Sequence, residues 1–210
     1  MKFDGIIFDM DGTLWDTVDN VCAAWNASFA ADGVEKRIDA KELSGYMGLP
    51  MDEIAERVFV GHSYDEVRHI FDNCMRRENE YLLKNGGGIL YPGLIDTLRI
   101  LSAKVPLYIV SNCQSGYIEV FFEVFGTRKF FRDWECFGNT GELKAENIRK
   151  IVERNGIKKP VYVGDTMGDY EACQKAGVPF IYAAYGFGEV DCPDYRIGKF
   201  ADLPELVADD

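Results

Sequence analysis

The stretch GIIFDMDGT, residues 5–13, decides the fold, because an apolar run passes directly into two aspartates, a glycine and a threonine. A short run that is apolar at every position is typical of a strand buried on both faces, as in a parallel sheet. Carboxylates that follow such a strand lie at the carboxyl edge of the sheet, where open α/β sheets bind ligands. The stretch therefore predicts that Asp9 and Asp11 stand at a ligand site.

Further apolar runs resemble the first, and helical patterns lie between them. Strands are expected over residues 5–8, 106–112, 160–165 and 179–186. Helices are expected over residues 92–103, 116–126, 145–156 and 169–177. The first of these helices begins with Pro92, which suits a first helical turn, and the others end at glycines, which suit helix C-termini. Strands that alternate with helices predict right-handed βαβ units and an α/β fold with a doubly wound parallel sheet.

Residues 16–88 break this alternation, because they contain helical patterns and no convincing strand. We interpret them as a helical domain inserted after the first strand, and residues 1–15 and 89–210 as the α/β core. The three glycines at 86–88 leave the backbone free to bend, so they suit the linker that returns to the core.

The composition limits the partners of the chain. Its 210 residues include 23 basic and 35 acidic side chains, and the net charge of -12 argues against nonspecific binding to nucleic acid or to an anionic membrane. The six cysteines show no metal-binding spacing and indicate reduced thiols. The sequence shows neither a signal peptide nor an apolar run of about 18 residues. We therefore expect a cytoplasmic protein with no membrane or nucleic-acid partner.

Polar side chains mark the ends of the later predicted strands. The second strand ends in Ser111 and Asn112, and the third ends in Asp165, with Asp169 four residues further on. Between these strands, Lys144 begins a helix. A single acidic pair is better explained by turn or helix-cap chemistry. Carboxylates from separate strand ends would converge, however, and would repel one another unless a cation joined them. Hard oxygen ligands suit Mg²⁺. The serine, asparagine and lysine supply the hydrogen-bond donors and the positive charge that bind a phosphate.

Such a site has the parts for phosphoryl transfer. One aspartate can act as a nucleophile, since carboxylates form aspartyl-phosphates. A second aspartate two residues on can transfer a proton to the leaving group. A metal ion would hold the nucleophile and a phosphate oxygen together and neutralise charge. Gly12 lets the backbone approach the phosphate closely, and Thr13 follows it at the same edge.

Together these residues resemble the four motifs of the haloacid dehalogenase-like hydrolases. The motifs are DxDGT at residues 9–13, a serine or threonine at Ser111, a lysine at Lys144 and GDxxxD at residues 164–169. All four occur in the family's order and span nearly the whole chain. The helical insertion resembles the family's four-helix cap, which places the chain beside phosphoglycolate phosphatases, pyrophosphatases and β-phosphoglucomutase. The cap size and the YGFG turn at residues 185–188 resemble the phosphoglycolate phosphatase branch.

The resemblance implies roles for the motif residues and an activity. Asp9 would be the nucleophile and Asp11 the acid and base, with Lys144 as a third catalytic residue. Mg²⁺ would be bound by Asp9, the Asp11 carbonyl and Asp165, and Asp169 would order the metal's water shell or Lys144. The phosphoryl group would be held by Gly12, Thr13, Ser111, Asn112 and Lys144. The implied protein is a monomeric or homodimeric phosphatase that acts on a small phosphorylated metabolite.

Individual residues argue against three rival activities on the same fold. The family's mutases resemble one another in a histidine of the first cap helix, and here that register falls on Val21. The family's dehalogenases lack the second aspartate of the first motif, so Asp11 argues against that activity. A non-catalytic phosphate-binding regulator would usually have lost a motif residue, and none is lost here. Within the cap, residues 45–50 are expected to face the site.

Overall fold

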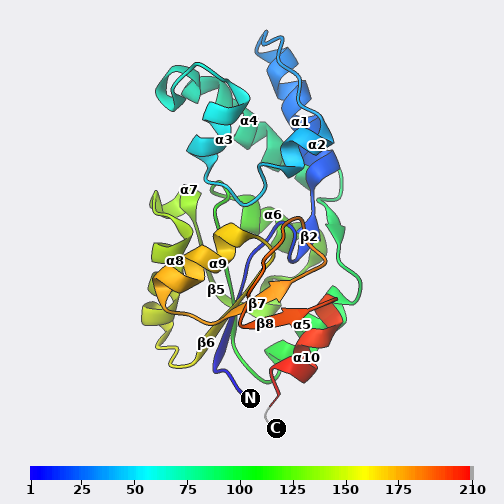
Figure 1. Ribbon diagram of the computed structural model, residues 1–210. Helices are drawn as coiled ribbons and strands as arrows, with labels where there is room; N and C mark the ends of the chain where they lie inside the picture. The colour runs from blue at the N-terminus through cyan, green and yellow to red at the C-terminus, as the bar shows by residue number, and fades with distance from the viewer. Residues whose placement is uncertain (209–210) are drawn as a thin grey trace.

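A computed structural model describes residues 1–208, which form an α/β core and a group of helices beyond one edge of its sheet (Figure 1). The core contains a six-stranded sheet in the order β5-β4-β1-β6-β7-β8, and every neighbouring pair is parallel. Its strands are β1 (Gly5–Phe8), β4 (Leu107–Ser111), β5 (Phe131–Cys136), β6 (Pro160–Gly164), β7 (Phe180–Ala183) and β8 (Tyr195–Ile197). The predicted doubly wound parallel sheet is confirmed.

Both faces of the sheet are covered, as the apolar first strand requires. The core helices are α5 (Leu94–Ser102), α6 (Tyr117–Phe125), α7 (Phe137–Thr140), α8 (Lys144–Asn155), α9 (Met167–Ala176) and α10 (Leu203–Leu206). Ile6 and Phe8 point to one face and join the apolar cluster of α5, α6 and α10, whereas Ile7 points to the other face and joins the cluster of α8 and α9. Alternate side chains of one strand thus bind two helical layers to one sheet.

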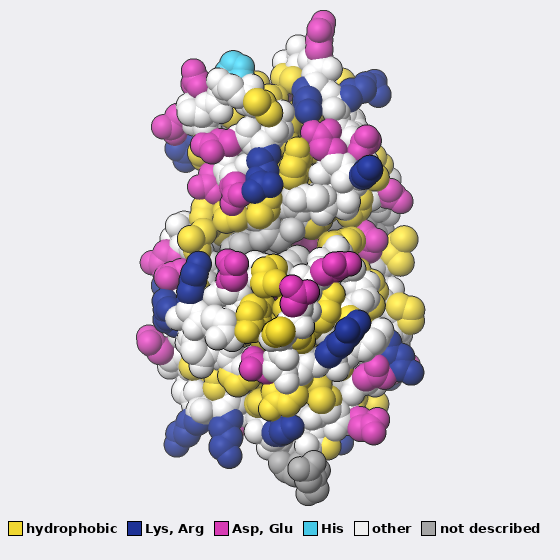
Figure 2. All heavy atoms as spheres, in the orientation of Figure 1, with side chains coloured by type: hydrophobic (Ala, Val, Ile, Leu, Met, Phe, Trp, Pro, Cys, Tyr) yellow, Lys and Arg dark blue, Asp and Glu magenta, His cyan; other side chains and the backbone are white. Residues whose placement is uncertain are grey.

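The inserted residues form helices that lie over the carboxyl ends of the strands (Figure 1). They are α1 (Val18–Ala31), α2 (Ala40–Ser44), α3 (Met51–Val58) and α4 (Tyr64–Lys84). The two long helices pack against each other through aromatic side chains, with the rings of Trp25 and Phe71 5.3 Å apart. We call these four helices the cap. Acidic and basic side chains are spread over the outer surface of both cap and core (Figure 2).

A short antiparallel ribbon joins the cap to the core. Strand β2 (Trp15–Asp16) pairs with β3 (Ile89–Leu90), so that Trp15 lies opposite Leu90 and Asp16 opposite Ile89. Of the three glycines before β3, Gly86 and Gly87 have φ of +81° and +72°, values that L side chains rarely adopt. The predicted domain boundary at 15/16 lies within β2, and the one at 88/89 lies directly before β3. The last two residues of the predicted core lie outside the described residues.

The structure differs from the sequence-based expectations at several elements. Strands β5 and β8 were not expected, and β7 ends at Ala183, so residues 184–186 turn toward the carboxyl edge of the sheet. Helix α5 begins at Leu94 rather than at Pro92, because Gly93 at the helix N-cap has φ of +80° and cannot continue a helix. Within residues 1–208, no helix has both the length and the hydropathy of a membrane span.

Candidate active site

Three motif side chains meet at the carboxyl edge because their strands are neighbours in the sheet. Asp9 follows β1, Ser111 ends β4 and Asp165 follows β6, and β1 pairs with both of the other strands. After β5 the chain crosses to the opposite side of β1, so this edge is the switch point at which open sheets bind ligands. All three side chains are buried.

Carboxylates from two motifs form a compact acidic group. Asp9, Asp165 and Asp169 each offer an oxygen atom, and these atoms lie within 4.8 Å of one another. Burial, followed by the charge of Asp169, raises the pKa of Asp9 to about 7. Burial, followed by the charges of Asp169 and Asp9, raises the pKa of Asp165 well above its usual range. Buried carboxylates at this separation favour a bound cation, and their hard oxygen atoms suit Mg²⁺.

Lys144, the first residue of α8, supplies one positive charge to this group. Its Nζ lies 2.9 Å from Asp9 Oδ1 and also donates to Asp169 Oδ1. Burial alone would lower the pKa of Lys144, but the charges of Asp169 and Asp9 outweigh it and raise the pKa above its usual value. Asp169 Oδ2 accepts hydrogen bonds from the backbone N–H groups of Asp165 and Thr166, at 3.1 and 3.0 Å. Asp169 therefore positions Lys144 and the loop that carries Asp165.

Asp165 is held tightly by groups that surround its carboxylate. Thr13 Oγ1 donates to Asp165 Oδ1 at 3.2 Å, and the Phe187 N–H donates to Asp165 Oδ2 at 2.7 Å. A Cβ on Gly12 would lie 2.1 Å from Asp165 Oδ2, and one on Gly186 would lie 2.3 Å from Asp165 Cβ. The hydroxyl of Thr13 thus faces a carboxylate, and its part in phosphate binding stays a prediction. The YGFG turn, noted in the sequence only as a resemblance, packs directly on the acidic group.

Gly186→Ala is expected to weaken divalent-metal binding by about 10–100-fold, because the added methyl group must displace the Asp165 carboxylate. Its nearest neighbours would be Asp165 Cβ, Oδ2 and Cγ at 2.3–2.5 Å. The measurement is the Mg²⁺ concentration that gives half-maximal phosphate release. Gly168→Ala is the matched control, since its Cβ would meet nothing closer than Thr166 Oγ1 at 3.6 Å. Equal metal dependence in the two variants would contradict the expected role of Gly186.

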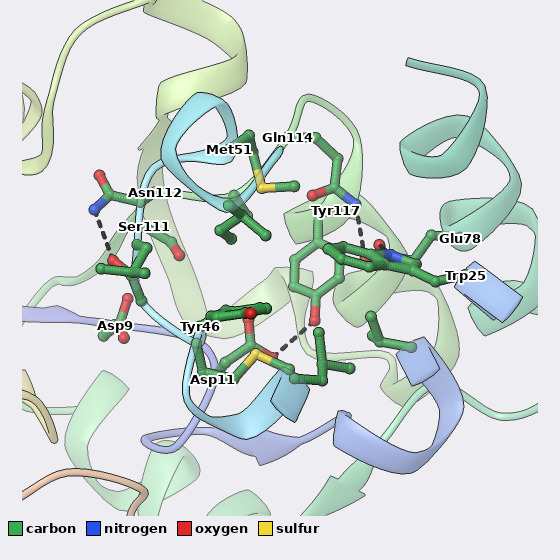
Figure 3. Close-up of a pocket in the computed structure, with 17 residues that line it drawn as sticks. Asp9, Asp11, Trp25, Tyr46, Met51, Glu78, Ser111, Asn112, Gln114 and Tyr117 are labelled. Carbon is green, nitrogen blue, oxygen red and sulfur yellow. Dashed lines mark hydrogen bonds between the residues drawn. The ribbon is translucent and has the colours of Figure 1, made fainter. Parts of the chain in front are cut away.

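Asp11 lies apart from the acidic group and faces the cap. Its Oδ1 accepts a hydrogen bond from Tyr117 Oη at 2.7 Å (Figure 3). The same oxygen accepts a second one from Thr17 Oγ1, also at 2.7 Å. Burial raises the pKa of Asp11 to about 6, although these two hydrogen bonds lower it. A carboxyl group with such a pKa can give and take a proton near neutral pH. Sequence reasoning did not single out Tyr117 or Thr17 as partners of Asp11.

A cavity leads from the motif residues into the cap. Its volume is about 40 Å³, so the cavity is narrow. The expected facing segment does reach it, because Tyr46 and Met47 line the cavity and Asn112 Nδ2 donates to the Gly48 carbonyl at 2.9 Å. Val21 also lines it, at the position where the family's mutases carry a histidine.

The cap contributes a buried carboxylate that the sequence did not single out. Glu78 of α4 lines the cavity and accepts hydrogen bonds from Trp25 Nε1 and, at 2.8 Å, from Gln114 Nε2 of the core (Figure 3). Burial raises the pKa of Glu78 to about 7. In the sequence Glu78 directly follows Arg76 and Arg77, a pair that is typical of a solvated helix face.

Comparison with known proteins agrees with this geometry. The chain is 28% identical over 209 residues to a phosphoglycolate phosphatase of Agrobacterium fabrum, covering 94% of this chain and 89% of the relative. It is 28% identical over 210 residues to a phosphoglycolate phosphatase of Synechococcus elongatus, covering 96% of each chain. The fold matches a haloacid dehalogenase-like hydrolase from Streptococcus pneumoniae with a TM-score of 0.82 and 24% identity over 99% of both chains.

A sequence model of the haloacid dehalogenase-like hydrolases matches residues 6–183, which carry both the sheet edge and the cap. The match thus includes Asp9, Ser111, Lys144 and Asp165, whose side chains the fold brings to one edge. The protein belongs to the haloacid dehalogenase-like hydrolase family.

Proposed function

We propose that the protein is a Mg²⁺-dependent phosphatase that hydrolyses a small phosphorylated metabolite through an aspartyl-phosphate on Asp9. The observation that carries this proposal is the placement of two aspartates with different surroundings. Both aspartates line the cavity, but Asp9 belongs to the acidic group beside Lys144, whereas Asp11 accepts hydrogen bonds from Thr17 and Tyr117. We assign the attack on phosphorus to Asp9 and the proton of the leaving alcohol to Asp11.

The chain's own residues carry the two half-reactions. Asp9 attacks phosphorus, the bond from phosphorus to the leaving oxygen breaks, and Asp11 gives its proton to that oxygen. Water then attacks the aspartyl-phosphate, Asp11 takes a proton from the water, and inorganic phosphate leaves with Asp9 restored. Ser111, Asn112 and Lys144 would hold the phosphoryl oxygens throughout. In support, Lys144 contacts Asp9, and Ser111 and Asn112 line the same cavity as Asp9.

The acidic group is the proposed metal site. Asp9, Asp165 and the carbonyl of Asp11 would hold Mg²⁺, and Asp169 would act through Lys144 and the loop before α9. When bound, the ion neutralises the charge shared by the nucleophile and the phosphate. The support is chemical, because the site offers several buried carboxylate oxygen atoms and only one lysine to compensate them.

The relatives and the cap make the protein phosphoglycolate phosphatase-like, so phosphoglycolate is the first substrate to test. A phosphosugar mutase is the second candidate, and the aliphatic side chain of Val21 in the cavity wall disfavours it. A non-catalytic regulator is disfavoured by the intact motifs. We further propose a cytoplasmic protein that acts as a monomer or homodimer.

A ³¹P NMR time course on a panel of phosphomonoesters tests the proposal. We expect inorganic phosphate to appear in proportion to the ester consumed, to stop when EDTA removes the metal, and to resume with excess Mg²⁺. Full activity without a divalent metal would contradict the metal site. An added glucose monophosphate should not change the products, because a hydrolase passes the phosphoryl group to water. Conversion of that acceptor into its isomer, faster than phosphate release, would show a mutase instead.

A further inference from the structure

The cavity beside Asp11 is the part of the site that would contact the leaving group, and its lining is mostly apolar. Val21, Trp25, Met51 and Ile54 of the cap contribute side chains to its wall. Among the 17 residues that line it, all within the described chain, none is lysine, arginine or histidine. Lys144, the positively charged residue among the motifs, already contacts Asp9 and Asp169.

Three side-chain donors of this lining, those of Trp25, Gln114 and Tyr117, are already bound to acceptors of the protein. Gln114 Nε2 donates to Glu78 Oε1 at 2.8 Å and to Asn79 Oδ1 at 3.1 Å, which uses both of its hydrogens. Trp25 Nε1 donates to the other oxygen of Glu78, and Tyr117 Oη donates to Asp11. A carboxylate that approached these three side chains would therefore lose its hydration without gaining their hydrogen bonds or a cation.

Two carboxyl groups also face the space that the leaving group would occupy. Glu78 is 3% exposed, and the charge of Asp11 acts on it across the cavity. Each Glu78 oxygen accepts one hydrogen bond from the protein and retains a further lone pair. The lining thus offers acceptors and carbon surface, and it opposes negative charge.

We propose that this site selects phosphomonoesters of uncharged, largely apolar alcohols, and that Glu78 excludes leaving groups that carry a carboxylate or a second phosphate. The inference rests on the proposed phosphatase function and narrows its substrate class. It places phosphoglycolate, the first candidate by relationship, among the poor substrates. A hydrogen-bond donor on the leaving group, such as a hydroxyl or an amide N–H, would be accepted by Glu78.

The test compares phosphoglycolate with the phosphate ester of glycolamide, which has the same size and shape but no carboxylate. Both are assayed with Mg²⁺ at about pH 8, above the pKa of Glu78, so that this side chain is charged. We expect kcat/KM for the amide to exceed that for the acid by at least about tenfold, because like charges in one cavity repel strongly. Equal or better turnover of phosphoglycolate would overturn the inference.

Glu78→Gln tests whether Glu78 causes the preference for the glycolamide ester. It keeps the shape of Glu78 and removes its charge, so the preference for the amide should shrink by at least about fivefold. Glu80→Gln is the matched control, since Glu80 lies on the same helix and pairs with Arg76 at 2.8 Å on its exposed face. A preference that Glu78→Gln leaves unchanged would contradict the role of Glu78.

Failure of the phosphatase proposal can be told apart from failure of the inference about the cavity. If neither these esters nor the wider panel releases phosphate, the phosphatase proposal fails. Calorimetric binding of the two esters with Mg²⁺ then decides the inference about the cavity. Tighter binding of the glycolamide ester supports it, and equal or weaker binding overturns it.

Discussion

Asp9→Asn is expected to lower the rate of phosphate release by at least about a thousandfold, because the amide cannot form the acyl-phosphate on which turnover depends. The substitution keeps the shape of the side chain and removes one of three clustered buried carboxylates, so the variant should still fold. Single-turnover and steady-state assays with Mg²⁺ measure the loss, and thermal melting checks the fold.

Asp4→Asn is the matched control for this change. Asp4 stands at the opposite end of the same strand, where its carboxylate accepts hydrogen bonds from the backbone N–H groups of Lys158 and Lys159. Losing its charge should leave turnover unchanged. If Asp9→Asn retained more than about a tenth of the normal rate, which is about 1.4 kcal/mol of barrier, Asp9 would not be the nucleophile.

Lys144→Met is expected to damage both activity and stability. Activity should fall by at least about a hundredfold, since a preorganised positive charge is lost beside the phosphoryl group. The carboxylates of Asp9 and Asp169 would remain buried without their partner, and breaking such a pair costs about 3–5 kcal/mol. For a chain of this size, that loss lowers Tm by roughly 10 °C, measured by calorimetry in metal-free buffer.

Lys150→Met tests the same substitution six residues further along α8. Lys150 pairs with Glu142 at 2.9 Å, and both side chains are more than 40% exposed. An exposed pair contributes at most about 1 kcal/mol, so its loss should leave Tm almost unchanged. Equal Tm values for the two lysine variants would show that Lys144 does not stabilise the acidic group.

The motif residues could be placed from the sequence because each follows a strongly apolar run. Asp9, Ser111 and Asp165 stand at the ends of strands that are buried on both faces, and the parallel sheet then brings them together. Strand β5 gave no such signal, because FRDWEC mixes polar and apolar residues. At this edge of the sheet, Asp133 and Glu135 can pair with Arg154 of α8, at 2.8 and 3.1 Å, so a strand forms without an apolar run.

The side chains that tune the site were harder to find, because their roles depend on contacts between distant segments. Tyr117 reaches Asp11 across 106 positions, and Glu78 meets Gln114 across 36. On a helix with many charged residues, nothing local distinguishes the one carboxylate that is turned inward. Its burial depends on how the cap and core meet, and helical periodicity alone does not specify that arrangement.

The paired strands β2 and β3 have a consequence for how such a protein can diversify. Because Trp15 lies opposite Leu90 and Asp16 opposite Ile89, the outgoing and returning chains leave the core side by side. The cap therefore occupies a single point of insertion, as a replaceable module whose two ends already meet. Its length and sequence can vary without any change in the order of the sheet. A lineage can thus acquire a new substrate by rebuilding this module while its reaction chemistry is inherited intact.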